Sequence, residues 1–441
     1  MSSPAKKKIL ALAALSLALA LSACKEERLC ASDEALCGLT CSTLATDRAN
    51  CGACGHACEA GQVCTSGECV FGTAQNCGAL GRTCESGERC VSGDCIADLY
   101  LACFNTSEVR EATFELAAAG VPVATAAGPL SLAWLGDTLY VADSLNGTVD
   151  VLRFDPPAVR STGTITIPAV GFSDLEFITA ANGLLYVSNA AAQVLDVLDP
   201  VGKRIVDEIP LGAGAFPQGI LVASASKAYV ALNGLSEIAV VDVSGSGTCA
   251  SPPCGSIAKH IPIPAELASP SGSPLPARLA LSGGKLYVTL WNLKVDFTPA
   301  GSGRLAVIDT ATDTLVTADG SHPVDLGAAC QNPGDIAVQG QVLYVTCGFN
   351  PFDAPTSITG AAIVPVDVSS GAPAVHTALA LPSNNAGAIA FCGGAGYVGD
   401  RASGAVLKYD PGSSSIVSTR ALCPAPGTGG TPFVAAVACG I

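Results

Sequence analysis

The chain has little histidine, the side chain that most often acts as a general acid or base. Its 441 residues include only four histidines, scattered at His56, His260, His322 and His376. They do not form the HExxH spacing of a zinc site, and no GxSxG nucleophile turn follows an apolar strand into a helix. The sequence therefore lacks the signatures of zinc peptidases and of serine hydrolases, and it predicts no cofactor.

Positive charge is also scarce. Lysine and arginine number 22 against 37 aspartates and glutamates, which gives a formal net charge of −15 at pH 7. A surface with this excess of acid repels phosphate backbones and anionic lipid head groups. Nucleic acid is therefore not an expected partner.

Long apolar runs are limited to one short segment near the start of the chain. Ile9–Leu21 is a run of thirteen apolar and small residues, too short to cross a hydrocarbon layer of roughly 30 Å as a helix. It follows Lys6, Lys7 and Lys8, and a charged stretch before such a run is typical of a secretory signal. We therefore expect residues 1–23 to be a signal peptide.

The end of this run, Leu21, Ser22, Ala23 and Cys24, resembles the lipobox of bacterial lipoproteins. The resemblance implies cleavage before Cys24 and lipidation of this cysteine, so that several acyl chains hold the protein to a membrane. Lys25 is not the aspartate that signals inner-membrane retention, which favours the outer membrane of the cell envelope, on its periplasmic or its surface face. An ordinary signal peptide that is cut nearby is the alternative.

Cysteine, by contrast, is abundant. Of the 21 cysteines, twelve lie between Cys30 and Cys95, a density typical of an oxidising compartment and of a small module held by disulfides. Residues 30–95 contain a duplication, because Asn50–Cys69 and Asn76–Cys95 repeat one phrase at an offset of 26 residues. The segment resembles cysteine-rich modules of secreted bacterial envelope proteins, and residues 24–29 tether it to the lipid.

The duplication predicts part of the disulfide pairing. Cys54 has no counterpart in the second unit, where Leu80 takes its place, so its partner should also lack a counterpart. We therefore expect Cys54 to pair with Cys37 or Cys41, and Cys30 to pair with the other. The remaining four cysteines of each unit then pair among themselves. Zinc binding by the CxxC and CxxxC pieces is the alternative, disfavoured because so small and polar a module needs covalent cross-links.

Seven of the eight tyrosines recur in one phrase, in which a hydrophobic or small residue precedes tyrosine and valine or leucine follows it. Around them, period-2 alternation rich in Val, Ile and Leu predicts strands, and long stretches of helical period are nearly absent. Spacings of 40 to 58 residues between tyrosines match four-stranded propeller blades with loop insertions. We therefore predict an all-β fold, with a seven-bladed β-propeller over residues 96–441 and one tyrosine per blade: Tyr100, Tyr140, Tyr186, Tyr229, Tyr287, Tyr344 and Tyr397.

The two ends of the chain predict how the ring closes. The first tyrosine unit has no inner strand before it, because the preceding residues belong to the cysteine-rich module. The missing strand is found at the other end, where Phe433–Cys439 aligns with Pro129–Leu135 and Pro333–Val338. We therefore expect the C-terminal strand to complete blade 1 and to leave no open sheet edge between the chain ends.

The positions of the eight ring cysteines in the predicted strands and loops predict how they pair. An antiparallel inner hairpin places the start of its first strand beside the end of its second, where Cys330 and Cys347 lie. The same argument pairs Cys423 with Cys103, which would clasp the ends of the ring. Cys249 and Cys254 lie on one loop and are expected to pair there. Cys392 and Cys439 occupy nearly matching positions in neighbouring inner strands and form the last pair. The predicted disulfides are Cys103–Cys423, Cys330–Cys347, Cys249–Cys254 and Cys392–Cys439.

The units resemble YVTN-type β-propeller repeats over roughly residues 96–441. Tyr140–Asp143, Tyr186–Asn189 and Pro217–Ile220 carry the resemblance. It implies a binding or scaffolding surface more readily than an activity, so the expected function is a lipid-anchored envelope protein that binds a protein or a glycan. The alternative is an enzyme that uses the central channel, since some similar propellers are lactonases or quinone-dependent oxidoreductases.

Only one repeat position is chemically varied enough to bind a ligand. It is the third residue at the entry of each inner strand, and inner strands line the channel of a propeller. We expect Asp174, Arg278 and Asp335 to converge at the channel mouth as candidate binding residues; the alternative is that they only solvate the channel and pair with one another. No catalytic or metal-binding residue is predicted. The seven aligned residues are Ser131, Asp174, Gly219, Arg278, Asp335, Ala388 and Val434.

Overall fold

The computed structural model divides the chain into two compact units, the second of which runs without interruption from Cys95 to Ile441. Among the described residues, no helix is long and apolar enough to cross a membrane. The helical segments described are single 3-10 turns, η1 (Phe104–Thr106), η2 (Asn233–Leu235), η3 (Ser246–Thr248) and η4 (Ala265–Leu267). The structure describes residues 30, 34–38, 40–47, 49–58, 62–65, 67–71, 88–91, 94–97, 99–155, 158–168, 173–269, 271–316, 323–349, 361–382, 385–427 and 431–440.

Short antiparallel hairpins make up the cysteine-rich part of the chain. A mainly polar sequence with so few apolar residues buries little surface, and the strands are accordingly three or four residues long. The hairpins are β1 (Ala35–Cys37) with β2 (Thr40–Ser42), β3 (Gln62–Thr65) with β4 (Glu68–Phe71), and β5 (Glu88–Val91) with β6 (Asp94–Ala97).

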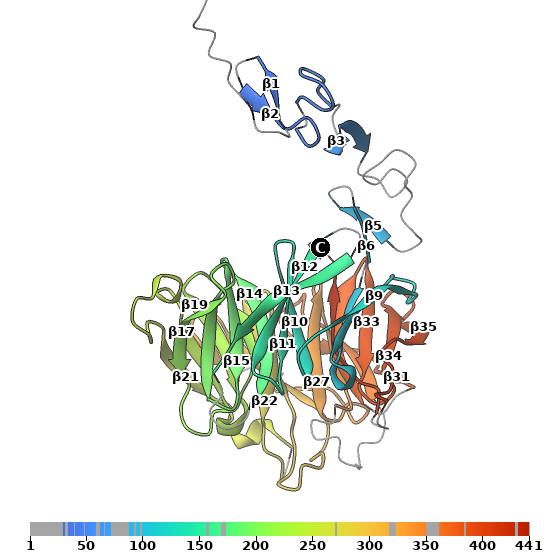
Figure 1. Ribbon diagram of the computed structural model, residues 1–441. Helices are drawn as coiled ribbons and strands as arrows, with labels where there is room; N and C mark the ends of the chain where they lie inside the picture. Colours follow the sequence, from blue (N-terminus) through green and yellow to red (C-terminus); the bar gives the residue numbers. More distant parts are fainter. Residues whose placement is uncertain are drawn as a thin grey trace, which may run out of the picture. The chain divides into compact units, whose positions relative to one another are not determined.

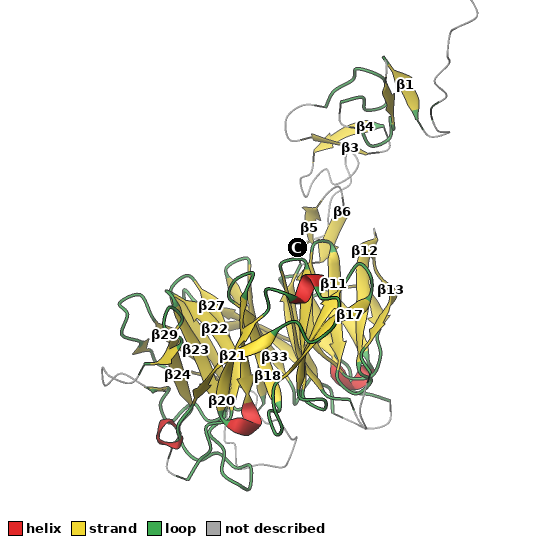
Figure 2. Ribbon diagram, turned by 90° about the vertical axis from the view of Figure 1, so that its left-hand side faces the viewer, coloured by secondary structure: helices red, strands yellow, loops and turns green. Residues whose placement is uncertain are grey.

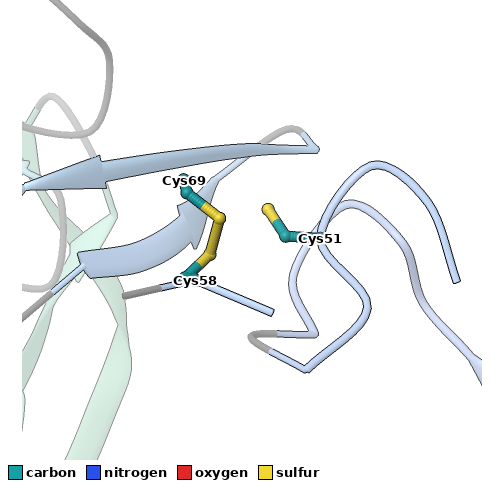
Figure 3. A group of neighbouring side chains, drawn as sticks. All are labelled: Cys51, Cys58 and Cys69. Carbon is teal, nitrogen blue, oxygen red and sulfur yellow. A yellow bond between two sulfur atoms is a disulfide. The ribbon is translucent and has the colours of Figure 1, made fainter. Parts of the chain in front are cut away.

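Disulfides hold these hairpins together. Cys54 is bonded to Cys37, which is one of the two partners expected for it, and the first four-cysteine set closes on itself. Figure 3 shows Cys51 beside the bonded pair Cys58 and Cys69; all three sulfurs are in disulfides, so none is a thiolate that could bind zinc. The bonds are Cys30–Cys41, Cys37–Cys54, Cys51–Cys64 and Cys58–Cys69. The pairing of Cys77, Cys84, Cys90 and Cys95 lies outside what the structure describes.

Seven antiparallel sheets form a ring in the second unit, which confirms the predicted seven-bladed β-propeller (Figure 1). Within each sheet the innermost strand is given first. The first four blades are blade 1, β36 (Val434–Cys439), β7 (Leu99–Cys103), β8 (Glu108–Ala112) and β9 (Ala118–Ala124); blade 2, β10 (Pro129–Leu135), β11 (Thr138–Asp143), β12 (Thr148–Asp155) and β13 (Ala158–Thr166); blade 3, β14 (Leu175–Ala181), β15 (Leu184–Asn189), β16 (Val194–Asp199) and β17 (Arg204–Pro210); and blade 4, β18 (Pro217–Val222), β19 (Lys227–Leu232), β20 (Glu237–Asp242) and β21 (Ser256–Pro262).

The outer strand is split in two of the remaining blades. In blades 5 and 6 two short pieces pair with the third strand where the other blades have one continuous outer strand. Figure 2, coloured by secondary structure, shows that the ring consists mainly of strands. These blades are blade 5, β22 (Pro276–Ser282), β23 (Lys285–Leu290), β24 (Arg304–Asp309), β25 (Thr314–Leu315) and β26 (Val324–Asp325); blade 6, β27 (Pro333–Gln339), β28 (Val342–Cys347), β29 (Ala361–Asp367), β30 (Ala374–Val375) and β31 (Leu379–Leu381); and blade 7, β32 (Ala386–Cys392), β33 (Ala395–Asp400), β34 (Ala405–Asp410) and β35 (Ser415–Ala421).

The C-terminal strand closes the ring, as predicted. β36 pairs antiparallel with β7, and the register joins Val434 to Cys103 and Cys439 to Leu99. The Cys103–Cys423 disulfide clasps the two ends across 320 residues of sequence. The structure also contains the other three bonds expected in the ring, Cys249–Cys254, Cys330–Cys347 and Cys392–Cys439.

The hydrophobic core lies between neighbouring blades. One cluster, for example, packs Tyr186 and Leu195 of blade 3 against Val230 and Ala239 of blade 4, and these side chains are almost completely buried. Alternation along each strand sends every second side chain toward one neighbouring sheet and the rest toward the other. Both faces of a blade are therefore apolar, which explains the Val, Ile and Leu content of the strands.

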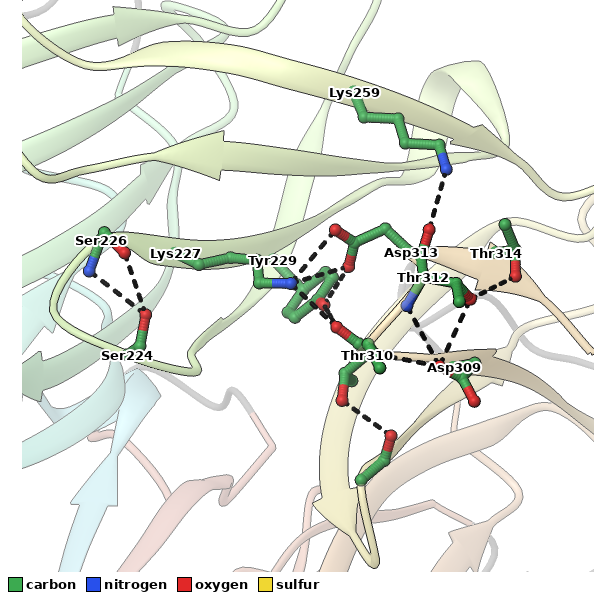
Figure 4. A network of polar contacts seen from close by, with 12 residues as sticks. Ser224, Ser226, Lys227, Tyr229, Lys259, Asp309, Thr310, Thr312, Asp313 and Thr314 are labelled. Carbon is green, nitrogen blue, oxygen red and sulfur yellow. Dashed lines mark hydrogen bonds and ion pairs between the residues drawn. The ribbon is translucent and has the colours of Figure 1, made fainter.

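The repeated tyrosine ties each of two blades to the next one. The hydroxyl of Tyr397 in blade 7 donates to the Phe114 carbonyl of blade 1 at 3.0 Å. In blade 4 the Tyr229 hydroxyl donates to Asp313, within the turn of blade 5 that corresponds to the turn holding Phe114 (Figure 4). A phenol has a ring for the apolar space between sheets and a hydroxyl for the polar turn beyond it. This combination explains why the repeat uses tyrosine.

Candidate binding site at the channel mouth

A cavity of about 250 Å³ opens where the inner strands begin. Its space comes from small residues, because Gly334, Gly387 and Ala436 occupy inner-strand positions where a large side chain would fill the channel. Charged and aromatic side chains from four different blades line the rest: Phe177, Arg278, Asp335, Phe349 and Arg401.

Two of the three predicted site residues, Arg278 and Asp335, line this cavity. The third, Asp174, does not occupy the aligned position. The strand registers pair Phe177 with Ser188 as they pair Asp335 with Thr346, so Phe177 is the blade 3 equivalent and Asp174 precedes the strand. The sequence alignment was three residues out there because blade 3 begins its inner strand at Leu175, where most other blades have a proline.

The alignment was also wrong in blade 1. The register pairs Ala436 with Ala102, so Ala436, rather than Val434, corresponds to Ser131 of blade 2. Another aligned residue has a packing role, since a Cβ on Gly219 would lie 2.5 Å from the Ala277 carbonyl oxygen. Neither position supplies a ligand-binding side chain.

Arg278 is the predicted residue that is best suited to bind a ligand. Its Cζ lies 5.1 Å from the centre of the Phe177 ring, so the guanidinium group makes a cation–π contact. Its Nη1 is buried and has no hydrogen-bond partner among the described residues. A group that is held by a ring and still has an unused donor can bind an acceptor in the cavity.

Asp335 mainly positions two blades. Its carboxylate accepts the backbone N–H of Ile336 at 2.9 Å and that of Ile389, on the inner strand of blade 7, at 3.0 Å. Ser131 makes the equivalent bond from blade 2 to Ile178 of blade 3 at 3.2 Å. Burial raises the pKa of Asp335, and the charge of Arg278 together with these N–H bonds opposes the rise. Its oxygens are thus already engaged by the scaffold.

Glu176 is the main residue that sequence reasoning missed. Burial, and then the charge of Asp174, raise its pKa to about 7, while Arg278, a hydrogen bond from Gln218 and Arg401 oppose the rise. Gln218 also has a buried Oε1 without a hydrogen-bond partner among the described residues. Asp174 hydrogen-bonds to Glu176 and accepts from Ser144 at 3.4 Å, and burial raises its pKa as well. Asp174 therefore interacts with Arg278 and its neighbours only through Glu176.

Arg401 is the second residue that was missed. It follows β33 and its guanidinium lies between two rings, with Cζ 4.6 Å from the centre of Phe349 and 4.2 Å from that of Phe433. Phe433 directly precedes the closing strand β36, so the chain ends help to hold this arginine. We call Asp174, Glu176, Gln218, Arg278, Asp335 and Arg401 the channel-mouth cluster.

The acids beside strand ends are structural. Asp199 accepts the backbone N–H groups of Val201 and Gly202 at 3.0 Å each, and Asp309 accepts those of Ala311 and Thr312. These are Asx-type turns that close the link to the outer strand. Such carboxylates lie away from the cavity lining and take no part in the candidate site.

Comparisons with known proteins fit the two-part architecture. Residues 20–98 match the model of the Stigma-specific STIG1-like protein family. The chain is similar in structure to the periplasmic gluconolactonase of Pseudomonas aeruginosa, at 15% identity and a TM-score of 0.56, over 76% of this chain and 97% of that chain. It is also similar to a protein from Lactobacillus plantarum, at 13% identity and a TM-score of 0.57, over 78% of this chain and 99% of that one.

A functionally unknown protein from Desulfotomaculum acetoxidans is a third similar structure, at 10% identity and a TM-score of 0.56, over 78% of this chain and 98% of that chain. At these identities the likeness shows the propeller fold alone. No curated protein matches the chain.

Proposed function

We propose that the propeller binds a small anionic ligand at the channel mouth. Two observations carry the proposal: Arg278 lines the cavity, and its buried Nη1 has no hydrogen-bond partner among the described residues. A buried donor without a partner costs roughly 1–3 kcal/mol, so a ligand that accepts this bond stabilises the complex. Carboxylate and phosphate oxygens are the acceptors that guanidinium groups bind best.

The electrostatics of the cluster support an anion. Arg278 and Arg401 are held by aromatic rings, which leave their positive charge in place. Burial raises the pKa of Glu176 to about 7, so this acid carries less than a full negative charge at neutral pH. Burial also raises the pKa of Asp174 and of Asp335. The cavity is therefore more favourable to an anion than the strongly acidic chain as a whole.

The size of the cavity limits the ligand. A volume of about 250 Å³ corresponds to roughly eight water molecules at ~30 Å³ each, so the ligand has the size of a small organic acid. Ser131 also lines the cavity, and its hydroxyl can donate a hydrogen bond to a ligand hydroxyl. Glu176 and Gln218 lie outside the lining, and Glu176 acts on the ligand through the charge of Arg278. These features together favour a hydroxylated carboxylate of the sugar-acid type.

Calorimetric titration of gluconate into the mature, oxidised protein tests this proposal. We expect saturable binding to the wild type, and a loss of affinity of roughly 10- to 150-fold in Arg278→Ala, which corresponds to ~1.5–3 kcal/mol for a hydrogen bond to a charged group. Lys227→Ala is the matched control, because Lys227 lies in a different polar network, and it should bind as the wild type does. Equal binding by the Arg278 variant would reject the site.

Lactone hydrolysis is the second candidate function. A carboxylate whose pKa is near 7 can take a proton from water at neutral pH, and the two arginines can stabilise the oxyanion that forms on the carbonyl. Water would add to the carbonyl carbon, the ring C–O bond would break, and the ring oxygen would take the proton. The similarity to a gluconolactonase supports trying this substrate class.

Proton release from gluconolactone, followed against the uncatalysed rate, tests this activity. Glu176→Gln should abolish any enzymatic rate and still bind gluconate, because the amide keeps the shape of the carboxyl group. A protein that binds gluconate and does not accelerate hydrolysis is a binding protein alone.

The cellular setting is part of the same proposal. Lipidation at Cys24 would place the ring on the envelope, with the outer membrane favoured, where an envelope protein or a glycan can also contact it. Metabolic labelling with a fatty-acid probe and membrane fractionation should show a labelled, membrane-bound wild type and an unlabelled Cys24→Ala variant. Labelling that persists in the variant would reject this anchor.

A further inference from the structure

A second cavity lies away from the channel, between blades 6 and 7. Its volume is about 480 Å³, larger than that of the channel mouth. Tyr344 and Pro365 line it from blade 6, and Tyr409, Pro411 and Ser414 line it from blade 7. We call this space the 6–7 cavity.

The same place is filled at the boundary between blades 4 and 5. There Lys227 donates to Asp313 at 3.0 Å and 3.1 Å and to the Thr310 carbonyl at 2.9 Å, and Tyr229 donates to Asp313 (Figure 4). Lys259 donates to the Thr312 carbonyl at 3.2 Å and covers this turn from outside. We call Lys227, Tyr229, Thr310 and Asp313 the 4–5 network.

The strand registers identify the equivalent residues. Lys227 pairs with Asp242 as Val342 pairs with Asp367, so Val342 replaces the lysine. Ser414 lies four residues after Asp410, as Asp313 does after Asp309, and both have a positive φ, of 49° and 53°. Ser414 therefore replaces Asp313. Without the ion pair, the space that the lysine chain fills in one boundary is open in the other.

The split outer strand of blade 6 opens the cavity further. β30 ends at Val375 and β31 begins at Leu379, so His376–Ala378 leave the line of the sheet. The chain is held there by the backbone N–H of His376, which donates to the Pro365 carbonyl at 2.9 Å. His376 and Thr377 are exposed and form one wall of the cavity.

We infer that the 6–7 cavity binds a neutral, hydroxylated ring, that is, a sugar residue. Val342, Pro365 and Pro411 are half-buried and provide apolar surface on which the C–H face of a sugar can pack. The rings of Tyr344 and Tyr409 pack against each other, with centres 5.7 Å apart, and are almost completely buried. Ser414, Thr377 and His376 supply hydrogen-bonding groups at the rim. The site does not depend on the channel-mouth cluster.

The charge of the lining decides against an ionic ligand. No Asp, Glu, Lys or Arg is among the described residues that line the cavity. Burial raises the pKa of Tyr344 and of Tyr409, so both phenols are neutral. An ionic ligand would lose hydration there without gaining an opposite charge.

Saturation-transfer NMR with glucose, N-acetylglucosamine and glucuronate on the mature, oxidised protein tests this inference. Transfer to one or both neutral sugars is expected in the wild type, and none to glucuronate is expected in Arg278→Ala, in which the channel mouth no longer binds a sugar acid. Ser414→Trp should fill the cavity from its exposed rim and weaken the binding at least tenfold, and Val342→Lys with Ser414→Asp should do the same by rebuilding the 4–5 network. Arg278→Ala should bind the neutral sugars unchanged.

Three results would overturn the inference. They are no transfer to either neutral sugar in the wild type, transfer to glucuronate as strong as to glucose in Arg278→Ala, and undiminished neutral-sugar binding in a folded Ser414→Trp protein. Because Ser414 is exposed, its replacement does not disturb the core, and a thermal melt shows that the variant is folded.

Discussion

The 4–5 network and the channel-mouth cluster contain similar residue types and satisfy them in different ways. Lys227 has three hydrogen bonds of 2.9 to 3.1 Å, all to the next blade. Arg278 is stacked on Phe177, and its buried Nη1 has no hydrogen-bond partner among the described residues. Groups that satisfy one another hold the scaffold together, whereas a buried group without a partner reduces stability. Under the proposed function, the unused donor of Arg278 is the group that a ligand satisfies.

Removal of the two arginines at the channel mouth should have the largest effect on gluconate affinity. Arg278→Ala combined with Arg401→Ala removes both cationic groups and should lower the affinity for gluconate by more than ~100-fold, since each charge-assisted bond contributes ~1.5–3 kcal/mol. The free energy of unfolding should fall only modestly, because the loss of the cation–π contacts, about 0.5–2 kcal/mol each, is partly offset by the removal of a buried donor without a partner. Calorimetry and urea unfolding measure the two quantities. A large loss of stability would show that the arginines are structural.

The 4–5 network should respond in the opposite way. Asp313→Ala removes the carboxylate that accepts from both Lys227 and Tyr229 and should lower the free energy of unfolding by about 1–3 kcal/mol. Gluconate affinity should not change. Asp325→Ala is a suitable control, since Asp325 is an exposed acid of the same blade whose nearest cation, Arg304, is 3.8 Å away; exposed pairs of this kind contribute ~0–1 kcal/mol. Equal effects from the two variants would remove the distinction.

A change of pH should alter gluconate affinity less than the loss of the two arginines does. The pKa of Glu176 is raised to about 7 from a usual 4.5, so its protonation at pH 6 removes a negative charge beside the anionic ligand. Affinity should fall by about fivefold between pH 6 and pH 8, which corresponds to ~1 kcal/mol of Coulomb energy at short range. Glu176→Gln should remove this dependence, and a slope that persists would place the titration elsewhere.

The same shift affects stability with a defined sign. The folded pKa of Glu176 lies above its unfolded value, so the folded state binds the proton more tightly. Its contribution to stability is therefore present below about pH 4.5 and is lost as the pH rises to about 7. The wild type should lose stability relative to Glu176→Gln across this window, as measured by urea unfolding at each pH.

The fold was predictable from the sequence because its signals are local and repeated. Period-2 alternation around each tyrosine identifies strands without any knowledge of contacts, and the unmatched segment Phe433–Cys439 identifies the closing strand. A comparison of two units within the chain limited the partner of Cys54 to Cys37 or Cys41, and the bond in the structure is to Cys37. In each case the repeat itself supplied the reference against which a missing or extra element could be recognised.

The candidate site was only partly predictable because it depends on register and on loops. Leu175 replaces the usual proline in blade 3, which hid Glu176 from the alignment. Arg401 reaches the cavity from a loop, between rings that come from two other blades. The 6–7 cavity depends on the residues Val342 and Ser414, which look unremarkable until the equivalent Lys227 and Asp313 are seen in contact.

The smallest expected effect is the difference in unfolding free energy between variants of Tyr229 and Tyr344. Tyr229→Phe removes one hydrogen bond to the next blade and should lower the free energy of unfolding by ~0.5–1.5 kcal/mol. Tyr344→Phe, at the equivalent position, should lower it by less, because Tyr344 lines the 6–7 cavity, where Ser414 has replaced the aspartate that accepts from Tyr229. Urea unfolding of both variants measures the difference. A loss as large for Tyr344 as for Tyr229 would mean that the two boundaries are equally tied, and the open cavity would then no longer distinguish blade 6 from blade 4.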